Sequence, residues 1–205
     1  MTPDVGAITP TDHDPLHLGV VVGSTRPGRR ADAVLDWVRP RAASRSTLEL
    51  VVVDLADHDL PQLDEPAPAR YGPPIRAHTH RLAAAVAPLD ALLFLVPEYN
   101  HSLPGVLKTA LDLLSDEWAD RAAGLVTYGA DAGGARAGEH LRAVLGELAV
   151  ATVQQQVGLS LVEHAPGGVL APTPRHEAQL ALLLDQLERW GGALRALRRP
   201  AEVLA

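Results

Sequence analysis

The chain of 205 residues contains no cysteine, and this absence excludes disulfide bonds, thiolate nucleophiles and cysteine-ligated metals. Aromatic residues make up only 3% of the sequence, so the core must be built from Ala, Val and Leu. No apolar run approaches the length of a membrane-spanning helix. The net charge of -7 argues against nucleic-acid binding, because no broad basic surface is indicated.

The N-terminal stretch MTPDVGAITPTDHDP is acidic and proline-rich, and it lacks the basic and apolar regions of a signal peptide. We therefore expect residues 1–15 to form a disordered tail and residues 16–200 to form a single domain. With 47% hydrophobic and 21% charged residues, the composition is that of a soluble globular protein. We expect a cytoplasmic location and no membrane partner.

Five short apolar segments alternate with segments of helical periodicity. Strands are expected at residues 16–22, 48–55, 91–96 and 124–128, with a fifth between residues 150 and 161. Segment 91–96 (ALLFLV) is continuously apolar, which is typical of a strand covered on both faces. The alternation predicts an α/β fold in which helices cover both faces of a parallel sheet.

Helices are expected between these strands. The first begins near Ala31 and is expected to end at Pro40, and the third begins at Pro104. The intervening loop at residues 56–74 is long and rich in proline and aspartate, so we expect it to be functional or interfacial. Apolar positions of the second and last helices are Ile75, Leu82 and Val86, and Leu180, Leu183, Leu184, Leu187, Leu194 and Leu197.

Three unusual loops follow the first, third and fourth predicted strands. They are GSTRPGRR at residues 23–30, PEYNHSLPG at residues 97–105 and YGADAGGARAG at residues 128–138. In an open parallel sheet, ligands bind outside the carboxyl ends of the strands, where the strand order reverses. The three loops together are therefore the predicted binding site.

The first loop has the composition of a phosphate site. Gly23 permits a tight turn, Ser24 offers a hydroxyl, and the following helix would direct backbone N–H groups at the same place. Arg26, Arg29 and Arg30 add fork-shaped donors for phosphate oxygens. The GK[ST] and GxGxxG patterns are both absent, so we predict a terminal monophosphate. The alternative is a solvated, salt-bridged surface.

The second loop could meet a flat heteroaromatic ring. Tyr99 offers an aromatic plane, and Asn100 can both donate and accept hydrogen bonds. We expect His101 to be structural or solvated rather than a proton donor. We expect Glu98 to be an exposed carboxylate rather than a base.

The third loop is rich in glycine. Gly129, Gly133 and Gly134 would permit a ligand to approach the backbone closely, the alternative being a flexible surface turn. No metal site is indicated, since His78 and His80 lie two residues apart and face different sides of a helix. The absence of a GxSxG motif argues against serine-hydrolase chemistry.

The three motifs together resemble the NADPH-dependent FMN reductase family of the flavodoxin-like superfamily, which includes quinone, azo-dye and chromate reductases. The resemblance rests on GSTRPGRR, PEYNHSLPGVLKTALDLLS and the YG…GG.RA segment, and it covers about residues 17–162. It implies a three-layer flavodoxin-like fold whose five-stranded parallel sheet has the order 2-1-3-4-5. It also implies non-covalently bound FMN and a homodimer or homotetramer with the flavin near a subunit interface.

The resemblance also assigns site residues. It implies that Gly129 flanks the flavin ring, and the flavin mechanism that it implies requires no catalytic acid or base. The residues that it places at the FMN phosphate are Ser24, Arg26, Arg29, Arg30 and Ala31. Those that it places along the isoalloxazine ring are Pro97, Glu98, Tyr99, Asn100, His101 and Ser102.

This chain departs from the family pattern at three positions. Thr109 and Leu113 stand where many relatives have Asn and Trp, and His101 stands where many have Gly. The missing Trp usually packs a subunit interface, and we expect Trp118 to substitute for it. We expect His101 to change access to the flavin face.

The function that the resemblance implies is an FMN-dependent NAD(P)H oxidoreductase. Hydride would pass from NAD(P)H to bound FMN and on to a quinone-like or other small acceptor. Three alternatives remain. They are a flavodoxin-type electron carrier, a reductase of diffusible FMN that supplies a monooxygenase, and an interaction protein without enzymatic activity.

Overall fold

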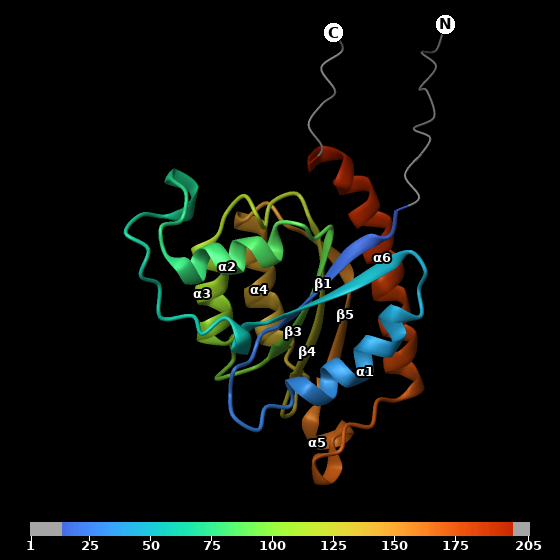
Figure 1. The fold of residues 1–205 in the computed structure, drawn as a ribbon. Coiled ribbons are helices and arrows are strands. Elements are labelled where there is room, and N and C mark those ends of the chain that lie inside the picture. Colours follow the sequence, from blue (N-terminus) through green and yellow to red (C-terminus); the bar gives the residue numbers. More distant parts are fainter. Residues whose placement is uncertain (1–13, 199–205) are drawn as a thin grey trace, which may run out of the picture.

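The computed structural model describes residues 14–198, which contain a five-stranded parallel sheet of order β2-β1-β3-β4-β5 (Figure 1). The predicted fold class and strand order are confirmed. Of the predicted N-terminal tail, residues 1–13 lie outside the described residues, as do residues 199 and 200 of the predicted domain. The strands are β1 (Leu16–Val22), β2 (Leu48–Asp54), β3 (Ala91–Pro97), β4 (Ala122–Gly129) and β5 (Ala151–Ser160).

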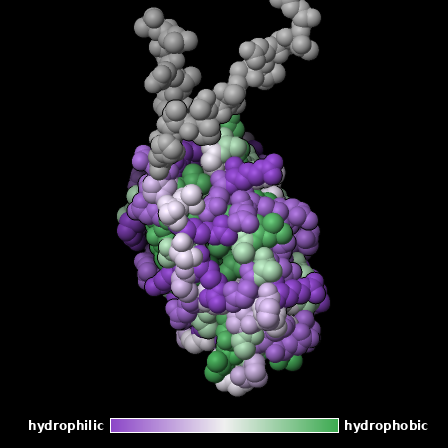
Figure 2. All heavy atoms as spheres, turned by 90° about the vertical axis from the view of Figure 1, so that its right-hand side faces the viewer, coloured by the Kyte–Doolittle hydropathy of each residue, from purple (hydrophilic) through white to green (hydrophobic). Residues whose placement is uncertain are grey.

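Helices cover both faces of this sheet (Figure 1). The helices α1 (Ala31–Ala43) and α6 (Pro174–Arg198) pack on one face. The other face carries α2 (Ala77–Val86), α3 (Gly105–Leu113) and α4 (Ala135–Glu147). The outer surface over α1 and α6 is mostly hydrophilic, as Figure 2 shows, so most apolar side chains of these helices lie inward against the sheet.

The burial of each strand follows its sequence pattern. Every residue of β3 and β4 is buried, as their continuous apolar runs require of strands between two helical layers. The edge strands β2 and β5 contain a mixture of buried, half-buried and exposed positions. The two layers of core are mainly aliphatic, and Phe94 and Trp118 form an aromatic contact in one of them, with 6.2 Å between ring centroids.

Trp118 corrects one expectation from the sequence. Its side chain is fully buried in the core of the protomer, so it does not replace the tryptophan that packs subunit interfaces in many relatives. The indole fills space between β3 and the segment after α3, where it contacts Phe94. A side chain that contributes to this core has no exposed area left for a partner.

Pro40 does not end the first helix, because α1 continues to Ala43. Proline removes only the hydrogen bond that its own N–H would make to the carbonyl of Asp36. Both Asp36 and Pro40 are exposed, so water can reach that carbonyl. A proline in the last turn on the outer side of a helix is therefore tolerated.

The prediction that Ile75 and Leu197 lie on the apolar faces of their helices is also wrong. Ile75 precedes α2 and is 62% exposed, since its N–H bonds to the Glu65 carboxylate at 3.2 Å instead of entering the helix. Leu197 is 65% exposed near the end of α6, which extends past the edge of the sheet (Figure 1). The short elements that the sequence pattern missed are α5 (Leu161–His164), η1 (Leu55–Asp57), η2 (Ala69–Tyr71) and η3 (Pro166–Gly168).

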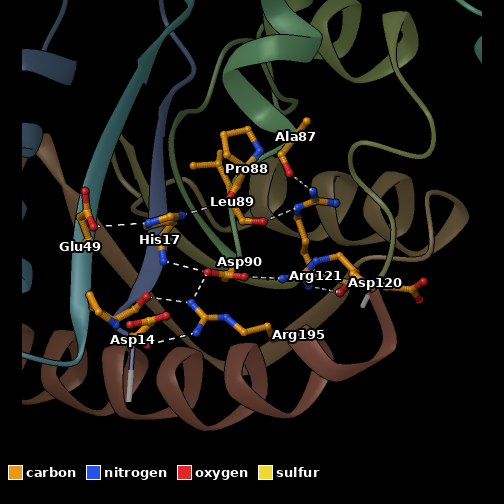
Figure 3. A network of polar contacts seen from close by, with 12 residues as sticks. Asp14, His17, Glu49, Ala87, Pro88, Leu89, Asp90, Asp120, Arg121 and Arg195 are labelled. Carbon is orange, nitrogen blue, oxygen red and sulfur yellow. Dashed lines mark hydrogen bonds and ion pairs between the residues drawn. The ribbon is translucent and has the colours of Figure 1, made fainter. Parts of the chain in front are cut away.

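The amino edge of the sheet is held together by a network of charges around Asp90 (Figure 3). The Asp90 carboxylate accepts a hydrogen bond from the His17 backbone N–H at 2.9 Å and pairs with Arg195 and Arg198 of α6. Burial raises the pKa of Asp90, but hydrogen bonds from Arg195 and His17 outweigh burial and leave the pKa below its usual value. The network therefore fastens α6 to the start of β3.

Arg121 lies behind this network and is buried. It donates to the carbonyls of Leu89 and Ala87 at 2.8 Å each, which lie just after the end of α2 (Figure 3). Burial lowers the pKa of Arg121 to about 10, and repulsion from Arg198 contributes to this lowering.

Within residues 14–198, no helix has both the length and the apolar character needed to cross a membrane.

Replacing Asp90 by Asn should lower the free energy of unfolding by about 3 kcal/mol near neutral pH, because two arginines lose a buried carboxylate. The folded-state pKa of Asp90 lies below the ordinary value of 3.8, so the stabilisation is complete above that value and is lost as pH falls through the folded-state pKa. Urea unfolding should show a difference between wild type and variant that narrows in acid.

Asp185→Asn is the matched control, because Asp185 also pairs with an arginine, Arg45, but its side chain is 61% exposed. That substitution should cost less than about 1 kcal/mol. If Asp90→Asn costs no more than the control, the network does not fasten α6.

Candidate functional site

The carboxyl ends of the five strands lie at the edge of the sheet opposite to both described chain ends (Figure 1). The loops after β1, β3 and β4 meet there, as the sequence predicted. Figure 1 places α5, which follows β5, at the same edge. The order of the strands reverses between β1 and β3, so the loops after these two strands flank the switch point.

A hydrogen bond between Ser24 and Tyr99 connects the first two loops. The Ser24 hydroxyl lies 2.9 Å from the Tyr99 hydroxyl, although the two residues are 75 positions apart. Ser24 is only 1% exposed, while Tyr99 is half-buried. Two residues that the sequence assigned to a phosphate and to a ring are therefore brought together at the switch point.

The start of α1 has the features of an anion site. Ala31 is the first residue of the helix, and the N-cap residue Arg30 makes no side-chain hydrogen bond to the first turn. Uncapped N–H groups at a helix N-terminus carry partial positive charge and favour a bound anion. Arg26 lies exposed in the preceding turn, and its side chain has no hydrogen-bond partner among residues 14–198. These groups are positioned to bind a phosphate.

Arg29 has a different environment from Arg26. Its guanidinium forms a two-pronged ion pair with Asp54 at the end of β2, and it donates to the Ser24 carbonyl at 2.6 Å. A third contact joins it to Asp32 at 2.9 Å. The hydrogen bond to Asp54 raises the pKa of Arg29, and although burial raises the pKa of Asp54, the Arg29 contact leaves it lowered overall. Arg29 therefore shapes the loop from within.

Arg30 points toward the segment after β5. Its guanidinium donates to the Gly168 carbonyl at 2.7 Å, across 138 positions of sequence. The segment that contains α5 and η3 is thus linked to the predicted phosphate loop. Because the side chain is bonded to Gly168, only the backbone of Arg30 is available at the start of α1.

The PEYNHS loop forms a tight turn. Pro97 ends β3, and Tyr99 and Ser102 bond to one another through both pairs of backbone groups, at 2.9 and 3.1 Å. The two residues between them, Asn100 and His101, have φ angles of 50° and 65°. Positive φ at both central positions is the geometry of a type I′ turn, which favours Asn followed by Gly. His101 therefore occupies a position that suits glycine.

Glu98 is not an exposed carboxylate, contrary to the expectation from the sequence. Its side chain is 9% exposed, forms an ion pair with Arg136 and accepts the Arg136 backbone N–H at 3.1 Å. Burial raises the pKa of Glu98, but the bonds from Arg136 and from the first amides of α4 outweigh burial and leave the pKa lowered. Glu98 caps α4 and connects it to the second loop.

The glycine-rich loop brings backbone against backbone. Gly134 has a φ of 79°, and a Cβ atom there would lie 2.7 Å from the backbone nitrogen of Tyr128. At Gly129, the last residue of β4, a Cβ atom would lie 3.1 Å from the nitrogen of Gly134. These glycines allow the loop to fold tightly over the end of β4. Their close approach is to the strand itself.

Several residues at the site were given no individual role from the sequence, although Tyr128 and Arg136 lie within the third predicted loop. Asp54 is the last residue of β2 and Tyr128 is the last but one of β4, at the same edge. A polar side chain near the end of an apolar strand is a signal that would have indicated a role for both. Arg136 and His140 lie on α4, and His140 contacts the Ser102 hydroxyl at 3.0 Å. Nothing in the local sequence indicates these α4 contacts, because their partners lie 38 positions away.

His101→Gly should raise the free energy of unfolding of the ligand-free protein by about 1 kcal/mol, because glycine accepts positive φ without strain. Chemical denaturation measures the change. His80→Gly, on the exposed side of α2, is the control and should instead lower stability by about 0.5 kcal/mol, as glycine does in helices. A loss of stability in both variants would contradict the turn geometry.

Comparison with known proteins places these features in a family. The family described as NADPH-dependent FMN reductase matches residues 16–164. The NAD(P)H-dependent FMN reductase of Nectria sp is 33% identical over 130 residues, which are 60% of this chain and 64% of that protein. A probable NADPH:quinone oxidoreductase of Oryza sativa subsp. japonica is 35% identical over 136 residues, 63% of this chain and 64% of that protein. The chain thus matches under two thirds of the length of either relative.

Solved structures of flavoenzymes share this fold. The flavoenzyme NAD(P)H:(acceptor) oxidoreductase FerB of Paracoccus denitrificans superposes with a TM-score of 0.67 at 22% identity, over 87% of this chain and 98% of that one. At this identity the likeness concerns the fold. The family match, by contrast, covers most of the chain and includes all three loops at the carboxyl edge, so this chain belongs to the NADPH-dependent FMN reductase family.

Proposed function

We propose that this protein is an FMN-dependent NAD(P)H oxidoreductase that reduces a quinone-like or other small acceptor. The observation that carries the proposal is the uncapped N-terminus of α1 beside Ser24 and Arg26, at the switch point of a flavodoxin-like sheet. The names of the relatives from Nectria sp and Oryza sativa supply the reaction class.

The residues at the carboxyl edge fit a flavin mononucleotide. The first turn of α1, the Ser24 hydroxyl and the Arg26 guanidinium would hold its single phosphate group. Arg29 is bonded to Asp54 and would act by fixing the shape of the loop. The exposed turn at Asn100 and His101, together with Gly129 at the end of β4, would lie along the ring. The bound flavin supplies the hydride-transfer chemistry.

The side chains near the ring favour binding over acid–base catalysis. The Glu98 carboxylate is bonded to Arg136, and its lowered pKa keeps it anionic near neutral pH, so it is a poor proton donor. Ser102 and His140 are bonded to one another. The protein's part is to bind, orient and partly shield the reacting groups.

Two other functions would use the same site. A flavodoxin-type carrier would hold FMN but would not accept electrons from NAD(P)H. A reductase of diffusible FMN would release the flavin on dilution. The Oryza sativa relative is named a quinone oxidoreductase, which favours a reductase that passes electrons to a small molecule.

The purified protein reconstituted with FMN should show the absorption of an oxidised flavin, and NADH or NADPH should bleach it without oxygen. Addition of a benzoquinone should restore the absorption. A carrier would stay oxidised with either nicotinamide.

Arg26→Ala should weaken FMN binding by about 10- to 100-fold, as expected for a charge-assisted hydrogen bond.

Arg39→Ala serves as the matched control, because Arg39 is exposed on α1 but lies more than two turns from its start. The control should bind FMN as wild type does. Equal affinity of wild type and Arg26→Ala would remove Arg26 from the phosphate site. Failure of the wild type to bind FMN would overturn the proposed function.

We also propose that the protein works in the cytoplasm as a homodimer or homotetramer. The loop between β2 and α2 presents Leu63 and Ile75 at 54% and 62% exposure. Beside it lies a hollow of about 400 Å³ lined by residues that include Pro73, Pro74 and Leu113. A loop that exposes two large apolar side chains next to a hollow is suited to a second copy of the chain.

Sedimentation analysis should give a dimer or tetramer for the wild type, and Ile75→Asp should shift it toward monomer, because a buried charge opposes association. Val162→Asp is the control, since Val162 is similarly exposed, at 66%, on α5 at another edge. A monomeric wild type would contradict the proposed assembly.

A further inference from the structure

Tyr128 carries a buried hydroxyl without a hydrogen-bond partner. The residue is 2% exposed at the end of β4. Within residues 14–198, three buried side-chain polar atoms lack a partner, namely Thr79 Oγ1, Trp118 Nε1 and the Tyr128 hydroxyl. Of these three residues, Tyr128 alone lies in a strand, as the last residue but one of β4 at the carboxyl edge.

The direction of the Tyr128 side chain is fixed by the strand. Its carbonyl accepts the Glu98 N–H at 2.8 Å, which holds this part of β4 to the end of β3. Thr127 points to the opposite face, where its hydroxyl donates to the Gly133 carbonyl at 2.8 Å. Because neighbours in a strand alternate, Tyr128 faces the layer that contains α1, and it belongs to that core cluster.

The hydroxyl lies in the layer that also contains the start of α1. Tyr128 and Ala31, the first residue of α1, belong to the same buried cluster. Burial, and next the proximity of Tyr99, raises the pKa of Tyr128 above its usual range. The phenol therefore remains a neutral O–H group and keeps its proton to donate.

A buried donor without an acceptor is costly, so native proteins almost always provide one. The N-terminus of α1 and the Ser24 and Arg26 groups around it are suited to a phosphate, whose oxygens are strong acceptors. A phosphate at this place would supply the missing partner for Tyr128. The Tyr99 hydroxyl already has one in Ser24.

We propose that the Tyr128 hydroxyl donates a hydrogen bond to the phosphate group bound at the start of α1, which makes Tyr128 a nucleotide-binding residue. The proposal rests on the proposed function, because it assumes that a phosphate-bearing flavin occupies the site. It adds β4 to the elements that bind the phosphate. An ordered internal water is the competing partner.

Tyr128→Phe removes the hydroxyl alone and keeps the ring in the core. Quenching of flavin fluorescence by the ligand-free protein gives the dissociation constants for FMN and for riboflavin, which lacks the phosphate. The variant should bind FMN at least about tenfold more weakly, as expected for a lost bond to a charged group, and riboflavin as wild type does. Its ligand-free melting temperature should equal or exceed that of wild type, because an unpaired buried group has been removed.

Tyr71→Phe is the matched control, since Tyr71 is 77% exposed in the loop before α2. It should change neither affinity nor melting temperature. Unchanged FMN affinity in Tyr128→Phe, with wild type binding FMN, would overturn the inference and assign the hydroxyl to water. An equal loss for FMN and riboflavin would also overturn it, by placing the contact away from the phosphate. Absence of FMN binding by wild type would instead contradict the proposed function.

Discussion

The ion pair between Arg29 and Asp54 fixes the loop on which the rest of the site depends. Asp54 ends β2 and pairs in register with Val22, the last residue of β1. The guanidinium therefore connects the ends of two neighbouring strands and also bonds the Ser24 carbonyl at 2.6 Å. Both side chains are 14% exposed, so each would leave a poorly solvated charge if the other were removed. With the loop held in this way, the Ser24 hydroxyl meets Tyr99 and the first amides of α1 face the open edge.

Most of the fold could be predicted from the sequence, because strands β1 and β3 are apolar runs ended by Gly23 or by a proline-containing turn. The predictions were wrong where the structural environment of a residue, and not its residue type, determined its conformation or burial. Ile75 fits a helical period, but the preceding prolines favour extended backbone and its N–H is bonded to Glu65. Pro40 is a helix breaker in the interior of a helix, yet it is tolerated in an exposed last turn. The burial of Trp118 depends on packing against Phe94, which no local pattern contains.

At the site, too, the sequence indicated which residues take part but not which partners they bond. The sequence predicted which loops meet, since parallel strands bring their carboxyl ends to one edge. It did not predict which groups bond, because the partners lie far apart along the chain. Arg29 and Asp54 are 25 positions apart, Glu98 and Arg136 are 38 apart, and Arg30 and Gly168 are 138 apart. Of the three arginines in the first loop, Arg29 and Arg30 bond the protein's own backbone and carboxylates. Arg26 is therefore the side chain suited to a ligand.

The two edges of the sheet differ in how their polar groups are satisfied. At the amino edge, a hollow of about 440 Å³ is lined by charged groups that already bond one another, since Asp90 is paired with both Arg195 and Arg198. Arg121 likewise donates to three carbonyls. A ligand there would have to replace formed contacts, and a group that is fully bonded gains little from a new partner. At the carboxyl edge, the α1 N-terminus and the Tyr128 hydroxyl are donors without acceptors among the described residues. Such unpaired donors are costly unless a ligand or water accepts their hydrogen bonds. This contrast supports the proposed binding at the carboxyl edge, although a hollow lies at the amino edge.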